Sequence, residues 1–194
     1  MGEERKVKDM LLDELSKVDF PLNYDRKNVV RGGNVKEGFV LGKVFSWGDA
    51  LKADPRRFRP SYKTNQPKYR NIWLLASKLM KLHDPNFKFT TIQFNKNNRT
   101  AKHKDRNNIG ESYMLGMGPY TDGDILVYDE NGKNPKRFKT KGWLKFDGSK
   151  YPHETMPFKG DRYTLVFFNV HREGFKLDDK AEWKADWHKN KNLN

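Results

Sequence analysis

The chain has 194 residues, which is the size of one domain and is long enough to enclose a substantial core. Lys and Arg number 39 against 25 Asp and Glu, and the resulting formal net charge of +14 favours a polyanionic partner such as nucleic acid. The sequence has no cysteine, which excludes disulfides, zinc–thiolate sites and thiol nucleophiles, so any metal must be bound by His and carboxylate side chains.

The apolar content is low but sufficient for a folded protein. Mean hydropathy is -1.01, yet aromatic residues make up 13% of the chain and supply large surfaces to bury. No apolar run approaches the roughly twenty residues of a membrane span, and the first residues lack the apolar stretch of a secretory signal. We therefore expect an intracellular protein without a membrane partner.

The first part of the chain predicts two amphipathic helices with a strand between them. Apolar residues recur at helical spacing over 4–18 and over 68–83, and a proline follows each segment. Their apolar stripes consist of Val7, Met10, Leu11, Leu15 and Val18 in the first helix and Ile72, Leu75, Leu79 and Leu82 in the second. Residues 38–47 are rich in β-branched and aromatic side chains and predict a strand, whereas three prolines between 55 and 67 indicate a basic loop.

From about residue 87 the pattern changes to short apolar runs separated by Gly, Asn and Asp. These runs, which predict strands, are 87–94, 111–118, 124–129, 137–141, 142–146 and 162–170. In the tail, Trp183 and Trp187 lie one helical turn apart and predict a short helix over 178–190. Helices followed by a run of strands indicate an α+β fold whose β part is a barrel or sandwich.

Three side chains form a candidate metal site. His103 precedes Asp105 by two residues, and positions i and i+2 of an extended segment project to the same side. His153 follows 48 residues later, a separation that several short strands can fold back across. Two His and one carboxylate occupy one face of an octahedron and leave the other face open, as an iron(II) oxygenase requires.

The histidines also allow other interpretations. A single His-x-Asp match is weak, because chance alone produces such matches, and it is also compatible with a polar surface turn. The pair His171 and Glu173 is followed only by His188, too near the end of the chain for another set of strands to return. His83, beside an Asp-Pro pair, is typical of a helix C-terminal cap.

A candidate anion site follows the metal motif. Arg162 lies nine residues after His153 at the start of an apolar strand, where an unpaired guanidinium is costly unless it meets an anion. Thr164 lies on the same face and offers a hydroxyl to the same carboxylate. The alternative is an internal ion pair between the arginine and an Asp.

His-x-Asp, a distal His and Arg-x-Thr, in this order, resemble the double-stranded β-helix 2-oxoglutarate oxygenases. The runs 89–129 and 143–168 are similar to the TET/JBP-like nucleic-acid-modifying branch, particularly its compact algal and viral members. The resemblance covers about residues 38–171 and implies a jelly-roll core with flanking N-terminal helices and a short C-terminal helix. A single dioxygenase domain over 1–194 then divides into a support region (1–85), a β-helix catalytic core (86–171) and a C-terminal helix and tail (172–194).

The resemblance also implies a role for each motif. His103, Asp105 and His153 would bind Fe(II), while Arg162 and Thr164 would hold the distal carboxylate of 2-oxoglutarate, whose other end chelates the iron. Molecular oxygen (O2) would be the oxidant and ascorbate a stimulating reductant. No catalytic residue beyond the metal ligands is implied.

Four further residues are candidates for binding. Gln93 and Asn95 alternate on one strand face and either reach the inner end of 2-oxoglutarate or hydrogen-bond within the core. Asn108 matches the position of a base-contacting Asn in the TET-like branch, or it shapes the turn before Gly110. His171 is similar in position to a base-contacting His of that branch, with its spacing shifted by one residue.

The substrate implied by the resemblance is a methylated base in DNA, with 5-methylcytosine oxidised to 5-hydroxymethylcytosine or further. The base of a methylated duplex would be flipped into the pocket, and the protein would act in the nucleus or another DNA-containing compartment of a host or viral system. The chain lacks the cysteine-rich zinc-binding region of the larger TET enzymes. Cations interleaved with aromatic residues between 56 and 70 either contact DNA instead or form a solvated face.

Two alternatives remain open. The same core serves hydroxylases of protein, RNA or free nucleotides, because fold does not decide function. A non-catalytic basic nucleic-acid-binding module would bind without iron or 2-oxoglutarate. The sequence predicts no oligomeric state.

Overall fold

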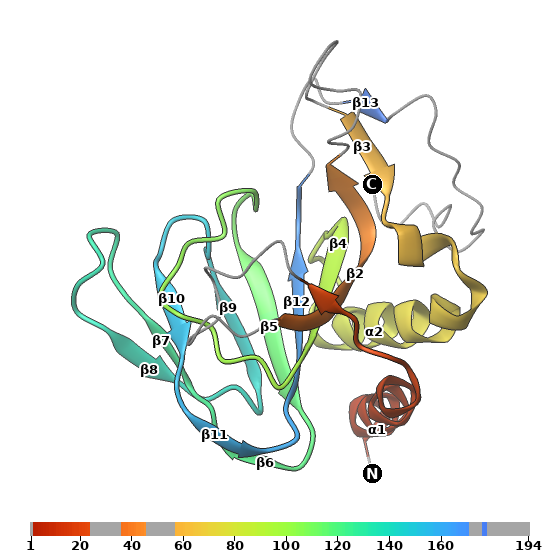
Figure 1. Ribbon diagram of the computed structural model, residues 1–194, viewed down its shortest axis with the longest axis horizontal. Coiled ribbons are helices and arrows are strands. Elements are labelled where there is room, and N and C mark those ends of the chain that lie inside the picture. The colour runs from red at the N-terminus through yellow and green to blue at the C-terminus, as the bar shows by residue number, and fades with distance from the viewer. Residues whose placement is uncertain (1, 24–35, 46–56, 171–175, 178–194) are drawn as a thin grey trace. The chain divides into compact units, whose positions relative to one another are not determined.

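The computed structural model, shown in Figure 1, describes residues 2–23, 36–45, 57–170 and 176–177. The chain forms two compact units: Met1–Val18, Val40–Ile92 and Val170–Asn194 make the first, and Asp19–Phe39 with Gln93–Asn169 make the second. His171 and the predicted C-terminal helix lie outside the described residues. Within the described ranges, no helix is both long and apolar enough to cross a membrane.

Two helices pack against each other in the first unit. Helix α1 (Glu3–Lys17) buries Val7, Leu11 and Leu15, and α2 (Arg70–His83) buries Ile72, Trp73, Ala76, Leu79 and Met80. Both helices were predicted, but their stripes were partly wrong. Met10 of α1 is 57% exposed. Leu82 of α2 is 38% exposed, because the buried face of α2 is rotated toward Trp73, whose ring lies 5.9 Å from that of Phe89.

The first unit also contains strands in the predicted basic loop. Residues 43–45 of β2 (Lys36–Phe45) pair antiparallel with β3 (Arg57–Pro60), and β3 pairs parallel with β13 (Lys176–Leu177). Two short 3-10 helices, η4 (Tyr62–Asn65) and η5 (Pro67–Tyr69), lead into α2. Side chains at both ends of this segment are core rather than surface, since Phe58 and Tyr69 are buried.

The second unit contains one large antiparallel sheet. Its order is β2, β4 (Thr91–Lys96), β12 (Tyr163–Phe168), β5 (Ser112–Met117) and β9 (Trp143–Phe146), and the short β1 (Leu22–Asn23) pairs with β2. Strands β4 and β5 are buried over most of their length, although β4 alternates apolar Ile92 and Phe94 with polar side chains on its other face. Stacked rings of Phe39 and Phe94, 4.9 Å apart, join β2 to β4 in the core of this unit.

Smaller sheets complete the β structure of the second unit. One has the order β10 (His153–Thr155), β7 (Ile125–Val127) and β8 (Lys136–Phe138), and the other pairs β11 (Phe158–Gly160) with β6 (Tyr120–Asp122). Most neighbouring strands are not consecutive in the chain, as in a jelly roll (Figure 1). The predicted α+β fold with a jelly-roll core and N-terminal helices is therefore confirmed, although β6, β10 and β11 are too short and polar to have been predicted as strands.

Candidate metal centre and adjoining pocket

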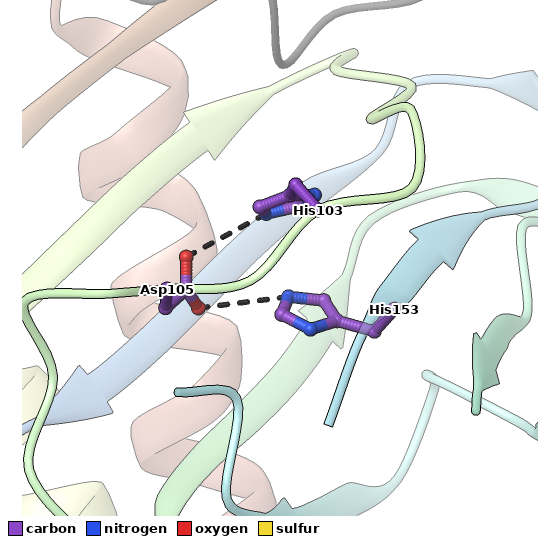
Figure 2. Close-up of side chains that lie close together, drawn as sticks. All are labelled: His103, Asp105 and His153. Atoms are coloured by element: carbon purple, nitrogen blue, oxygen red, sulfur yellow. Dashed lines mark ion pairs between the residues drawn. The ribbon is translucent and has the colours of Figure 1, made fainter. Parts of the chain in front are cut away.

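His103, Asp105 and His153 meet at one point of the second unit, as Figure 2 shows. The Nε2 atoms of His103 and His153 each lie 3.5 Å from a different carboxylate oxygen of Asp105. One potential ligand atom from each residue lies within 4.8 Å of the other two. The structure thus brings His153 next to His103 and Asp105, although 48 positions separate Asp105 from His153 in the sequence.

Backbone pairing brings these side chains together. His103 and His153 form an isolated antiparallel bridge, in which the N–H of each donates to the carbonyl of the other at 3.0 and 2.9 Å. The Asp105 N–H donates to the Gly148 carbonyl at 2.8 Å, and this bond fixes the third ligand against the turn before β10. Two short loops and the first residue of β10 therefore define the centre.

The two imidazoles are oriented for metal binding. Nδ1 of His103 lies 2.7 Å from the Ala101 carbonyl, and Nδ1 of His153 lies 3.1 Å from the Tyr151 carbonyl. Because a carbonyl oxygen only accepts, Nδ1 carries a proton in each ring and Nε2 is the atom that faces Asp105. Carbonyl partners of this kind are typical of the outer shell of metal-binding histidines, so the donor set fits a transition metal such as Fe(II).

Gly148 makes room for this arrangement. A Cβ atom at this position would lie 3.0 Å from the Asp105 Oδ2 and 3.2 Å from the His153 Cε1. Any larger residue would crowd two ligands at once. The sequence analysis did not single out Gly148, although the Asp-Gly pair at 147–148 is a turn signal.

Arg162 lies in the same pocket as the metal centre. Its side chain is only 2% exposed, and in the part of the chain that the structure describes it makes no ion pair. The predicted alternative of an internal Arg–Asp pair is therefore not found there; Asp124, whose charge acts on Arg162, instead binds Arg137 at 2.6 Å. Burial lowers the pKa of Arg162, and the nearby hydroxyl of Tyr120 opposes that shift.

Neutral groups hold the guanidinium. Its NH2 donates to the Gly123 carbonyl at 3.2 Å and to the Thr140 hydroxyl at 3.5 Å, while its buried Nε has no partner. The rings of Tyr120 and Phe158 lie 5.5 and 5.4 Å from its central carbon. A buried cation held only by neutral groups is a site for an anion.

Sequence reasoning missed the residues that support Arg162. Asn97, at a φ of 52°, accepts from the Arg162 N–H at 2.7 Å and donates its own N–H to the Arg162 carbonyl at 2.8 Å. A Cβ at Gly123, where φ is 73°, would lie 3.0 Å from the Arg162 Nε. Thr140 also donates to the Gly123 carbonyl. Nothing in the local sequence distinguishes these positions from ordinary turn residues.

The remaining site candidates divide by their hydrogen bonds. Gln93 donates through Nε2 to the carbonyls of Phe39 and Phe94, which favours its role within the core. Asn95 donates to the Thr164 hydroxyl at 3.2 Å, and its buried Oδ1 has no partner. Both amides line the pocket.

The pocket is partly open to solvent. It is lined by eight of the predicted site residues: His103, Asp105, His153, Arg162, Thr164, Gln93, Asn95 and Asn108. Asn108 has the turn role expected of it, because its N–H donates to the Asp105 carbonyl; it also lines the pocket, and its contact with a base stays a prediction. His171 lies outside the described residues.

The predicted DNA-binding loop is less suited to base stacking than its sequence indicates. Two of its three aromatic side chains, Phe58 and Tyr69, are buried, and Lys63 donates to the Tyr69 hydroxyl at 2.9 Å. Tyr62 is 79% exposed and is the one aromatic side chain of this loop available to a partner among the described residues.

Comparisons with known proteins agree with this fold. No protein-family model matches the sequence, and no curated protein matches it. Among solved structures, NgTET1 in complex with 5mC DNA is 16% identical with a TM-score of 0.56, over 92% of this chain and 73% of that one. An oxidoreductase of the 2OG-Fe(II) oxygenase family from Burkholderia pseudomallei is 14% identical with a TM-score of 0.55, over 82% and 76%. OsALKBH1 is 12% identical with a TM-score of 0.51, over 85% and 92%. The chain therefore has the fold of these proteins.

Proposed function

We propose that the protein is an Fe(II)- and 2-oxoglutarate-dependent dioxygenase that hydroxylates a methylated base in DNA, converting 5-methylcytosine to 5-hydroxymethylcytosine. The observation that carries the proposal is one pocket lined both by the His-Asp-His ligand set and by the buried Arg162, which makes no ion pair among the described residues. When bound there, iron and 2-oxoglutarate supply the oxidation by O2 that places one oxygen atom on the substrate and the other in succinate, with release of CO2.

The metal end contributes ligands and their orientation. His103 and His153 offer Nε2, and Asp105 offers a carboxylate oxygen. Each Nδ1–H donates to a backbone carbonyl, so neither ring can rotate away without losing a hydrogen bond. Three protein ligands leave the other positions of an octahedral ion for cosubstrate and oxygen.

The opposite end contributes recognition of a carboxylate. Arg162 supplies charge-assisted hydrogen bonds, which are strong where water is excluded. Asn95 donates to the Thr164 oxygen, so the hydroxyl proton of Thr164 is free to point at the anion. This pair of donors supports the assignment of Arg162 and Thr164 to the distal carboxylate of 2-oxoglutarate.

Three observations support DNA as the substrate. The net charge of +14 favours a polyanion, and NgTET1, which shares this fold, was solved with 5mC DNA. Asn108 lines the pocket beside the metal ligands, where its amide offers a donor and an acceptor to the edge of a base. A base must leave the duplex to reach such a pocket, so we infer that the substrate base is flipped.

The test is mass spectrometry of nucleosides from methylated duplex DNA incubated with protein, Fe(II), ascorbate, 2-oxoglutarate and air, with succinate quantified in parallel. We expect hydroxymethylcytosine and succinate in equal amounts, and neither product from a His103→Ala, Asp105→Ala double variant. Succinate without a modified base would redirect the search to protein, RNA or nucleotide substrates. Neither product from the wild type would contradict the enzyme and favour a binding module.

A further inference from the structure

Strand β8 and its flanking residues form a strongly basic segment. Residues 131–146 contain six Lys or Arg and no Asp or Glu. Arg137 is neutralised by Asp124 at 2.6 Å, and Lys145 by Glu111 at 3.1 Å. Lys133, Lys136 and Lys139 are exposed and make no ion pair with any residue in the described ranges. These three lysines are therefore available to an external anion.

The carboxylates nearest this segment in the sequence are already engaged. Glu130 pairs with Lys150 at 2.8 Å. Asp129 accepts from the N–H of Lys133 at 2.8 Å and of Asn131 at 3.0 Å, and the first of these bonds is the main cause that lowers the pKa of Asp129. Asp129 thus organises the turn that leads into β8 and leaves the lysine side chains unneutralised.

The strand register places part of the basic segment on the same face as the pocket. In the sheet β10-β7-β8, His153 lies opposite Val127 and Val127 opposite Lys136, while Thr155 and Ile125 align with Phe138 in the same way. Directly opposed residues of an antiparallel sheet project to one face. Lys136 and Phe138 therefore share the face of His153 and Thr155, at a distance of two strand spacings, about 10 Å.

Phe138 has the exposure expected of a contact residue. It lies on β8, an edge strand of this sheet (Figure 1), it is 36% exposed, and Lys136 and Lys139 precede and follow it in the sequence. An exposed ring flanked by free cations is the combination that binds nucleic acid, because the cations bind phosphates and the ring stacks on unpaired bases. An acidic protein partner would use the cations and leave the ring without a role.

We propose that Lys133, Lys136, Lys139 and Phe138 form a nucleic-acid-binding edge, which contacts the sugar–phosphate backbone of the strand whose base enters the pocket. The identity of that base rests on the proposed function, whereas binding by the edge does not require iron or turnover. In this proposal the pocket binds the base, and the nucleic-acid-binding edge binds the backbone of the strand that carries it.

The test is fluorescence anisotropy of a labelled, methylated DNA duplex titrated with metal-free protein at several salt concentrations. A Lys133→Glu, Lys136→Glu, Lys139→Glu variant is compared with a Lys6→Glu, Lys81→Glu, Lys88→Glu variant, which changes the same charge on exposed lysines of the first unit. Thermal unfolding of both variants verifies that they fold. The matched control separates a local contact from the effect of net charge.

We expect the edge variant to lose at least about tenfold in affinity and to reduce the slope of log K against log salt by about 2 to 3, since each lost phosphate contact removes about 0.9. The control should remain within about twofold of the wild type. Phe138→Ala should weaken binding of a single-stranded oligonucleotide by roughly fivefold or more, more than it weakens binding of the duplex.

Equal losses in both triple variants, or no loss in the edge variant, would overturn the proposal. Because the titration contains no metal, it is independent of catalysis. A wild-type protein that binds DNA through the edge but makes no succinate would refute the proposed enzyme and retain the edge. If the wild type makes succinate and the variant without the edge lysines binds DNA equally well, the proposed enzyme is retained and the edge is refuted.

Discussion

The two ends of the pocket are built on opposite principles. At the metal end, three ligands face one another, two of them on partly exposed loop positions, and backbone carbonyls hold the rings in place. At the arginine end, a positive charge is buried among neutral groups with no carboxylate in ion-pair range among the described residues. The first arrangement resembles a preformed ligand set. The second keeps a buried charge whose cost a bound anion would reduce. Variants at the two ends should therefore affect binding and stability differently.

Removing the metal ligands should have the largest effect. A His103→Ala, Asp105→Ala variant leaves one imidazole, so we expect Fe(II) affinity to fall by about 100-fold or more while the jelly roll stays folded. Anaerobic metal titration with protein-bound iron analysis measures this change. An Asp9→Ala, His83→Ala variant, which removes the same residue types from exposed positions in α1 and α2, is the control and should bind iron like the wild type. Unchanged iron binding in the first variant would refute the ligand assignment.

Replacing the charged side chain of Arg162 should weaken the binding of 2-oxoglutarate without lowering the stability of the unliganded protein. In Arg162→Met the cosubstrate loses its charged partner, and we expect 2-oxoglutarate affinity to fall on the order of 100-fold. Because no carboxylate is left unpaired, the free energy of unfolding without ligand should stay the same or rise. Thermal unfolding with and without 2-oxoglutarate tests both parts: the wild type should be stabilised by the ligand and the variant should not. A strongly destabilised variant would indicate that Arg162 has a structural partner instead.

The groups around Arg162 should have an intermediate effect. Thr140→Val removes a hydroxyl that accepts from the Arg162 NH2 and donates to the Gly123 carbonyl. We expect a loss of about 1 to 3 kcal/mol in unfolding free energy and a weaker affinity for 2-oxoglutarate, because the guanidinium is less well fixed. Thr121→Val, at an exposed position of β6, is the matched control and should change neither quantity.

The smallest effects are expected at the two amides, Gln93 and Asn95, whose loss should affect stability and 2-oxoglutarate affinity differently. Gln93→Ala breaks hydrogen bonds to the carbonyls of Phe39 and Phe94, so it should lower stability by about 1 to 3 kcal/mol with little change in 2-oxoglutarate affinity at a temperature where it is folded. Asn95→Ala removes the amide that orients the Thr164 hydroxyl by donating to its oxygen. This variant should instead weaken 2-oxoglutarate binding, with a smaller loss of stability. Chemical denaturation and calorimetric titration distinguish the two results, and the reverse pattern would exchange the roles.

The sequence predicted the ligand geometry because it depends on simple periodicity. In an extended segment, the spacing of His103 and Asp105 alone places both on one side, and the apolar run after Arg162 identifies a buried strand. Both helices and most long strands were predicted for the same reason. The second unit's jelly roll follows from the resemblance more than from the strand pattern, which allowed a barrel or a sandwich.

The supports of Arg162 and the buried face of the basic loop could not be predicted, because they depend on tertiary packing that no local sequence pattern indicates. Asn97 and Gly123 are ordinary turn residues in sequence, and only the returning β12 strand makes them supports of Arg162. In the basic loop, Tyr69 resembled a stacking residue but packs into the core of the first unit, because the segment folds into β3 and two 3-10 helices. Which face of such a segment is buried is decided by tertiary contacts rather than by propensity.

The most direct test of the central claim is an anaerobic calorimetric titration of 2-oxoglutarate into the protein with and without Fe(II), for the wild type, Arg162→Met and the His103→Ala, Asp105→Ala variant. If one cosubstrate is bound by both iron and arginine, Fe(II) must strengthen 2-oxoglutarate binding in the wild type, loss of the metal ligands must abolish that effect, and Arg162→Met must weaken binding in the presence of Fe(II). We expect this pattern. Binding of 2-oxoglutarate that is tight but independent of Fe(II), or of Arg162, would contradict the account.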